Sequence, residues 1–199
     1  MTSMPDLGPA ARRMAGLLAD VRDSQLTGPT PSGGMSLGAL IDHVDGLVLA
    51  FTRAAAKDFP EGRSEPPSAD AARLAPDWRT RVPERLGTLA AAWRSPDAWQ
   101  GMTQAGGLDL PAEQAGRVAM NELVVHGWDV SRAIGRTYDA DADEIEECLA
   151  FVAPAVERSG GQGLPGLFGP AVEVGADAPP LDRLIAMTGR DPSWTAEPS

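Results

Sequence analysis

The chain of 199 residues carries 17 basic and 28 acidic residues, a net charge of -11, and 43% hydrophobic residues. These values are typical of one globular domain with a sizeable core. Because the chain has no cluster of basic residues, we do not expect nucleic acid or anionic membranes as partners. No segment approaches the ~20 apolar residues that cross a bilayer, and the N-terminus has no signal-peptide pattern. The single cysteine, Cys148, excludes an internal disulfide and favours a reducing cytoplasm as the location.

Helical periodicity begins near the N-terminus. Apolar residues recur at helical spacing over residues 5–23 and again over residues 37–58, which predicts two helices. Ser36 immediately precedes the second segment and is its expected N-cap. Glycine and proline residues predict a loop over residues 28–34, and a polar, proline-containing linker is expected over residues 60–67.

Two further long helices are predicted in the middle of the chain. The first covers residues 76–99, where Pro83 either introduces a kink or marks the true start. A glycine-rich loop is expected over residues 101–109. The second helix covers residues 111–135, because its opening proline suits a first helical turn and its closing glycine is a good C-terminal stop.

The C-terminal quarter has weaker patterns. A shorter helix is predicted over residues 143–156, where four acidic residues near the start favour the positive end of the helix dipole. Residues 159–169 are glycine-rich and expected to be irregular, and residues 171–174 could form a short extended piece. A last helix is expected over residues 179–188.

Strand patterns are nearly absent, so the predicted fold class is all-α. Four long helices joined by short to medium loops indicate a four-helix bundle, with an additional short helix and an irregular C-terminal tail. We expect residues 1–158 to form the bundle and residues 159–199 to form a Gly/Pro-rich extension packed on it, within a single domain overall.

A candidate metal site is carried by two of the predicted helices. Glu122 and His126 are four residues apart and therefore share one helix face, while His43 lies on the second helix. Two imidazoles and a carboxylate form the ligand set of an open, three-residue site that suits zinc, nickel, iron or manganese. Asp129 lies three residues beyond His126 and is either a fourth ligand or an acceptor that orients an imidazole.

Other interpretations of these residues stay open. A buried histidine is often a hydrogen-bonded core residue, and a glutamate four residues before a histidine can be a simple side-chain pair. Against this, Glu122 is flanked by apolar residues, where a carboxylate is costly unless it is paired or bound to metal. Cys148 is predicted to be a small core residue. Arg53 and Arg132 could hold a substrate carboxylate, but a surface or ion-paired role is the expectation.

Several segments resemble one known family. Residues 121–133, Asn-Glu-Leu-Val-Val-His-Gly-Trp-Asp-Val-Ser-Arg-Ala, are similar to the signature helix of the DinB-like superfamily. More narrowly, they resemble the metal-binding domain of mycothiol-dependent maleylpyruvate isomerase and its uncharacterised actinobacterial relatives. Residues 40–47 resemble the first ligand helix of that group, and residues 178–184, together with residues 188–192 and Trp194, resemble the tail of a subgroup.

This resemblance implies a bundle that holds a divalent metal, most often zinc, through His43, Glu122 and His126. In such enzymes a low-molecular-weight thiol such as mycothiol binds the metal as a thiolate and attacks an electrophilic substrate. The isomerase has a separate C-terminal domain, whereas only about forty residues follow residue 156 here, so a thiol transferase or conjugating role is favoured over isomerisation.

Three alternatives accompany that function. The chain could be a non-catalytic protein that binds a metal or a small molecule, a metal-dependent hydrolase in which water takes the open position, or a protein with a purely structural histidine pair. The expected partners are a small-molecule thiol and an electrophilic substrate. A homodimer is an open possibility for the assembly.

Overall fold

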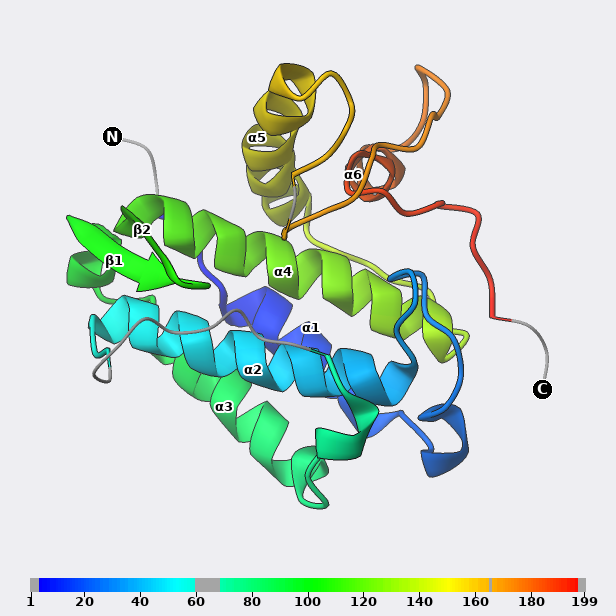
Figure 1. Cartoon of the computed structure of the whole chain (residues 1–199), viewed down its shortest axis with the longest axis horizontal. Helices are drawn as coiled ribbons and strands as arrows, with labels where there is room; N and C mark the ends of the chain where they lie inside the picture. The colour runs from blue at the N-terminus through cyan, green and yellow to red at the C-terminus, as the bar shows by residue number, and fades with distance from the viewer. Residues whose placement is uncertain (1–3, 60–68, 165, 197–199) are drawn as a thin grey trace.

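Four long helices lie side by side and form the main body of the structure (Figure 1), a computed structural model that describes residues 4–59, 69–164 and 166–196. Neighbouring pairs of helices pack together: α1 with α3 and α4, and α2 with α3 and α4. The predicted bundle is confirmed. The helices are α1 (Gly8–Ala19), α2 (Leu37–Ala56), α3 (Trp78–Ala92) and α4 (Ala112–Ala133).

Local sequence signals set several of the helix ends. The Ser36 side chain accepts a hydrogen bond from the backbone N–H of Ala39 at 3.3 Å and caps α2 as predicted. Pro83 lies inside α3, so it is not the start of that helix. The third helix was predicted to reach residue 99 but ends at Ala92, because the approach to Pro96 disfavours helical backbone. A short 3-10 turn, η3 (Pro96–Trp99), follows.

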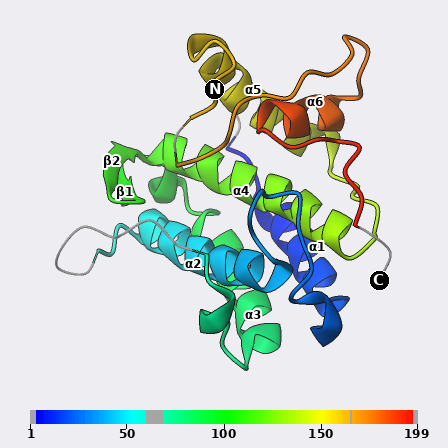
Figure 2. The ribbon, with the colours of Figure 1, turned by 45° about the vertical axis from the view of Figure 1, so that its right-hand side comes forward.

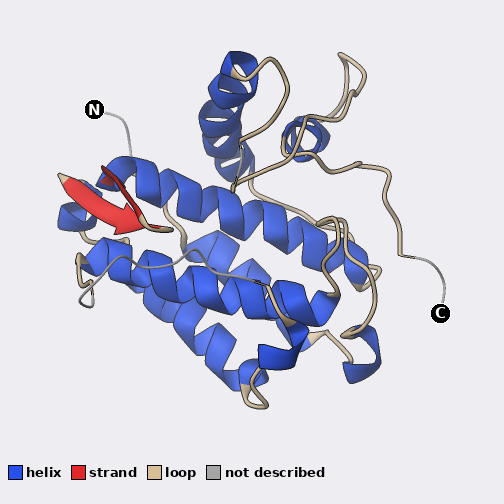
Figure 3. Ribbon diagram, in the orientation of Figure 1, coloured by secondary structure: helices blue, strands red, loops and turns tan. Residues whose placement is uncertain are grey.

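A small β-hairpin replaces the predicted glycine-rich loop over residues 101–109 (Figure 3). Its strands, β1 (Met102–Ala105) and β2 (Leu108–Pro111), pair antiparallel, with Thr103 opposite Leu110. Gly106 and Gly107, with φ of 56° and 79°, form a two-residue turn that requires positive φ at both positions. The Thr103 hydroxyl donates a hydrogen bond to the Ala54 carbonyl at 2.6 Å, which fixes the hairpin to the end of α2.

The C-terminal part of the chain lies against α4 (Figure 2). Here α5 (Ala142–Arg158) packs on α4, and α6 (Pro180–Met187) packs on α5. Phe168 and Leu184 are buried in the same apolar core as the bundle. The segment that was expected to be extended, residues 171–174, is no strand, although the Val172 N–H donates to the Ala186 carbonyl at 2.9 Å.

Two further predictions concern the linker after α2 and the absence of a membrane-spanning helix. The proline-containing linker over residues 60–67 lies outside the described residues. In the described part of the chain, no helix combines the length and the apolar character needed to cross a bilayer.

Two tryptophans that meet edge to face fill the end of the bundle nearest the hairpin. The ring centroids of Trp93 and Trp99 are 4.9 Å apart. The Trp93 indole N–H donates to the Phe51 carbonyl at 3.1 Å, and the Trp99 indole N–H donates to the Trp93 carbonyl at 2.7 Å. α4 approaches both rings through Gly116, where an added Cβ would lie 2.5 Å from Trp99 Cζ3 and 2.8 Å from Trp93 Cζ3.

Gly116→Ala should therefore destabilise the protein by about 1–3 kcal/mol, because neither buried ring has room to move away. The matched control is Gly16→Ala in α1, where an added Cβ meets nothing within 4 Å. That exchange should stabilise the protein by about 0.5–1 kcal/mol through helix propensity. Urea unfolding of both variants measures the difference, and equal free energies of unfolding would contradict this packing argument.

Candidate metal centre

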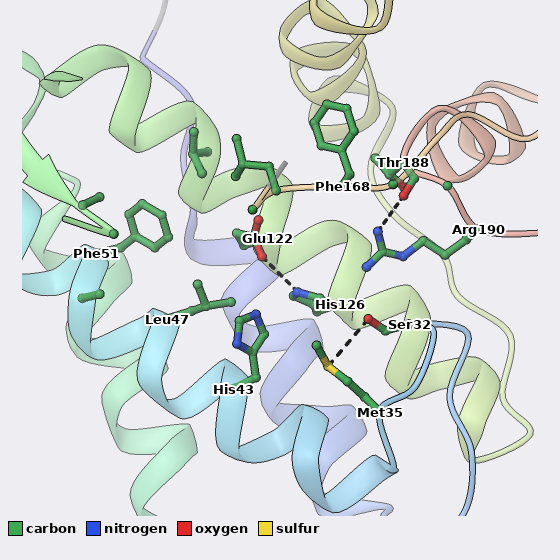
Figure 4. A pocket seen from close by; sticks show the side chains of 18 of the residues that line it. Ser32, Met35, His43, Leu47, Phe51, Glu122, His126, Phe168, Thr188 and Arg190 are labelled. Atoms are coloured by element: carbon green, nitrogen blue, oxygen red, sulfur yellow. Dashed lines mark hydrogen bonds and ion pairs between the residues drawn. The ribbon is translucent and has the colours of Figure 1, made fainter. Parts of the chain in front are cut away.

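Helices α2 and α4 bring His43, Glu122 and His126 together at one point (Figure 4). Each residue offers one ligand atom, and these atoms all lie within 4.8 Å of one another. The two imidazole rings meet edge to face with centroids 5.2 Å apart, and His126 Nε2 lies 3.0 Å from Glu122 Oε2. The sequence separated these residues onto two helices, and the structure gives them one common centre.

The position of this centre follows from the packing of α4. Glu122 and His126 are one helical turn apart, so both side chains project toward α2 from the same face. Between them, Leu123, Val124 and Val125 are buried against other parts of the core. Since α4 is enclosed on most of its circumference, its polar side chains face a dry environment, where each needs a partner.

Asp129 and Arg190 form the second layer of the centre. Asp129 is fully buried, and its Oδ2 lies 2.9 Å from His126 Nδ1 and accepts a hydrogen bond from Arg190 Nη2 at 3.0 Å. Arg190 Nη1 also donates to the Thr188 carbonyl at 2.8 Å. With Nδ1–H of His126 donating to Asp129, Nε2 is directed at His43 and Glu122, the orientation that metal-binding histidines adopt.

The charges at this centre compensate one another. Burial lowers the pKa of His126, but its hydrogen bonds to Asp129 and Glu122 outweigh that effect and raise it to about 9. Burial raises the pKa of Glu122 and of Asp129, yet the hydrogen bond and charge of His126 hold the first below its usual range, and Arg190 with His126 does the same for the second. Two carboxylates around one imidazole thus make this part of the core a place for a cation, either a proton or a metal ion.

A cavity of about 800 Å³ opens beside the three residues. Its walls come from α2, α4, the hairpin, the loop before α2 and two C-terminal segments, residues 166–169 and 188–190. Most of the lining side chains are apolar, and the polar ones gather at the centre and at one end. Such a cavity, largely apolar with a few convergent polar groups, is typical of a small-molecule site.

Arg190 was not predicted from the sequence as a site residue, although residues 188–192 carry part of the family resemblance and its partner Asp129 was a candidate. The two residues are 61 positions apart, and nothing local connects them. One signal was present: an aspartate on a largely apolar helix requires a counter-charge, and few arginines follow α4 in the sequence.

The remaining candidate residues take structural positions. Cys148 is buried on α5, and burial raises the pKa of its thiol, so the prediction of a core residue is confirmed. Arg132 Nε donates to the Trp194 carbonyl at 2.9 Å and holds the tail. Arg53 is exposed and does not line the cavity.

The fold and the centre define the class of protein, a four-helix bundle with a candidate two-histidine, one-glutamate metal group. The match to known families is more specific. Residues 7–131 match the mycothiol maleylpyruvate isomerase N-terminal domain family, and the chain belongs to that family.

Relatives extend the likeness beyond the matched residues. The chain is 28% identical over 178 residues to the uncharacterized proteins Rv0738 and MT0763 of two Mycobacterium tuberculosis strains, over 88% of this chain and 91% of each relative. Among solved structures, it is similar to the mycothiol-dependent maleylpyruvate isomerase, with a TM-score of 0.59 and 18% identity over 81% of this chain and 75% of that one. A histidine-to-alanine mutant of that enzyme gives a TM-score of 0.60 at 19% identity. These two structures support the fold.

Removing the Arg190 charge should test the second layer. Arg190→Met would leave the buried Asp129 carboxylate without its cationic partner, and we expect a loss of about 3 kcal/mol or more in the free energy of unfolding. Adding Asp129→Asn in the same chain should restore part of that loss, with a coupling energy of about 1 kcal/mol or more.

The control for this cycle is Arg136→Met. Arg136 pairs with Asp20 at 3.0 Å, but its side chain is 60% exposed, so the loss should stay below about 1 kcal/mol. Urea unfolding of all variants measures the loss for Arg190→Met, its coupling energy with Asp129→Asn, and the loss for Arg136→Met. Additive losses in the Arg190–Asp129 cycle would show that the pair carries no interaction energy.

Proposed function

We propose that the protein is a metal-dependent, thiol-using enzyme, in which His43, Glu122 and His126 hold a divalent metal ion. The observation that carries this proposal is the convergence of the three ligand atoms at the wall of the 800 Å³ cavity. Two imidazole nitrogens and one carboxylate oxygen fit an open site that leaves positions for a further ligand. When bound, the metal would lower the pKa of a coordinated thiol and hold it as the thiolate nucleophile.

The chain's own residues prepare the site for that chemistry. Asp129 accepts a hydrogen bond from Nδ1–H of His126 and so leaves Nε2 as the ligand atom. Arg190 balances the Asp129 charge, which leaves the Glu122 carboxylate as the anionic ligand facing the cavity. The apolar walls exclude water from the neighbourhood of the nucleophile and thereby strengthen its electrostatic interactions.

Zinc suits this donor set best, and nickel, iron and manganese are the other ions that accept it. Mycothiol is the proposed thiol, because the chain belongs to a family that is named after a mycothiol maleylpyruvate isomerase. We propose a transfer or conjugation reaction, in which the thiol adds to an electrophilic small molecule, and a cytoplasmic location, where thiols stay reduced.

Metal content is the first test. The purified protein, loaded with zinc and dialysed, should retain about one ion per chain by mass spectrometry. Because loss of an outer partner alone costs about 10–100-fold in metal affinity, Asp129→Asn should fall in that range, whereas His126→Ala and Glu122→Gln should lose more than about 100-fold.

The matched control is Asp42→Asn. Asp42 neighbours His43 in sequence, but its carboxylate pairs with Arg73 at 2.9 Å, away from the centre. Its affinity for zinc should equal that of the unmodified protein. Tight binding that survives His126→Ala would sink the proposed ligand set.

Thiol consumption is the second test. Zinc-loaded protein given mycothiol and a small enone should consume the thiol faster than the same mixture without protein, and chelation or His126→Ala should abolish the difference. A thiol-specific dye measures the rate. Hydrolysis of an activated ester without any thiol would instead identify a metal-dependent hydrolase. Stoichiometric zinc with no turnover on a panel of electrophiles and esters would identify a non-catalytic binding protein.

A further inference from the structure

The cavity has two chemically different ends on either side of the metal group (Figure 4). One end lies toward the hairpin, and we call it the hairpin arm. The other end lies toward the loop before α2 and the C-terminal segment, where Ser32, Thr188 and Arg190 supply polar atoms. The hairpin arm is lined by apolar side chains, namely those of Leu47, Ala50, Phe51, Ala105, Leu108, Leu110 and Val118.

The architecture explains this division. From His43, the next inward positions along α2 are Leu47 and then Phe51, and from Glu122 the preceding turn of α4 carries Val118. Both helices therefore run from the metal group into the hairpin arm with apolar residues only. The hairpin, fixed to α2 by Thr103, closes the arm with Leu110.

The charges of the lining do not suit a small dianionic acceptor. Among the described lining residues, Arg190 is the only arginine and there is no lysine. Its guanidinium already pairs with Asp129 through two hydrogen bonds, at 3.0 and 3.3 Å. The two carboxylates of such an acceptor would lie beside Glu122 and the thiolate, and they would have no counter-charge in the hairpin arm. Burial of unpaired charge is expensive.

The mouth of the cavity is also apolar. Leu108 is 67% exposed and Leu167 is 39% exposed, and both line the cavity. Large hydrophobic side chains that face water beside a cavity are typical of a ligand entrance. A cavity of about 800 Å³ is near the upper end of the usual range for one small-molecule ligand, so it has room for a thiol and an acceptor together.

We propose that the hairpin arm binds an apolar, aliphatic or aromatic, body on the electrophile that receives the thiol. This inference rests on the proposed function. In the reaction the thiolate sulfur forms a bond to the β-carbon of an enone, the electron pair of the C=C bond moves toward the carbonyl, and the α-carbon takes up the proton that the thiol released. The thiol approaches from the opposite, polar end.

The first experiment varies the electrophile. Zinc-loaded protein with mycothiol is given alkyl vinyl ketones from methyl to hexyl, which share one reactive group and differ only in apolar length. We expect kcat/KM to rise by up to about fourfold per methylene, the factor that burial of one CH2 supplies. A flat or falling series in the presence of thiol transfer would overturn the inference.

The second experiment places the apolar body. Leu110→Asn should remove the rise of kcat/KM with alkyl length. Met102→Asn should leave that rise unchanged, because Met102 is on the same hairpin but is 59% exposed and does not line the cavity. Ala50→Leu narrows the arm from the α2 side without adding a polar group. In this variant kcat/KM should stop rising at a shorter alkyl chain. Zinc content and thermal midpoints of all three variants are measured alongside, so that misfolding is recognised.

A readout independent of activity separates this inference from the proposed function. The uncharged fluorophore N-phenyl-1-naphthylamine should bind zinc-free protein, and Leu110→Asn should weaken that binding at least tenfold relative to Met102→Asn. Equal binding by both variants places the probe elsewhere and contradicts the assignment. Selective loss in Leu110→Asn without thiol consumption on any electrophile would overturn the proposed function and retain the hairpin arm as an apolar ligand site.

Discussion

The burial of two carboxylates and an imidazole within two turns of α4 is the constraint on which much of the structure depends. Glu122 and Asp129 lie on either side of His126, Asp129 fully buried and Glu122 largely covered at the wall of the cavity. Charges of one sign cannot be buried together without compensation. His43 reaches them from α2, and Arg190 reaches them from the segment after α6. The centre therefore ties the C-terminal segment to the bundle, and the side chains that would bind a metal are held by the same interactions that stabilise the fold.

The end of the bundle nearest the hairpin contains apolar side chains in place of the charged groups of the centre. The indole N–H groups of Trp93 and Trp99 donate to the backbone carbonyls of Phe51 and Trp93, and Gly116 lets α4 approach both rings. The hairpin covers this end but leaves a space between α2 and α4. That space becomes the apolar part of the cavity, because the residues that face it from both helices carry no polar atoms on their side chains.

The sequence is informative wherever the signal is local. Helical periodicity, the Ser36 cap and the glycine after α4 depend on neighbours within one or two turns, and the predicted bundle followed from them. The hairpin was missed because its strands have four residues each and their pairing depends on a contact from Thr103 to Ala54, 49 positions away. Arg190 was missed for the same reason, since its partner lies 61 positions earlier. The meeting of His43 with α4 was expected from the family resemblance, because spacing fixes only the faces of separate helices.

The boundary of the family match clarifies how the cavity is divided. Residues 7–131 contain all three candidate ligands and Asp129, so the candidate metal group lies within the part of the chain that matches the family. Phe168, Thr188 and Arg190 lie beyond it and complete the cavity wall. A change in the C-terminal segment can therefore alter the ligand that the cavity accepts and leave the ligand atoms in place. Arg190 is the exception, because it belongs to the wall and also balances Asp129. Through this one side chain, the shape of the cavity wall and the charge balance of the candidate metal site are physically coupled.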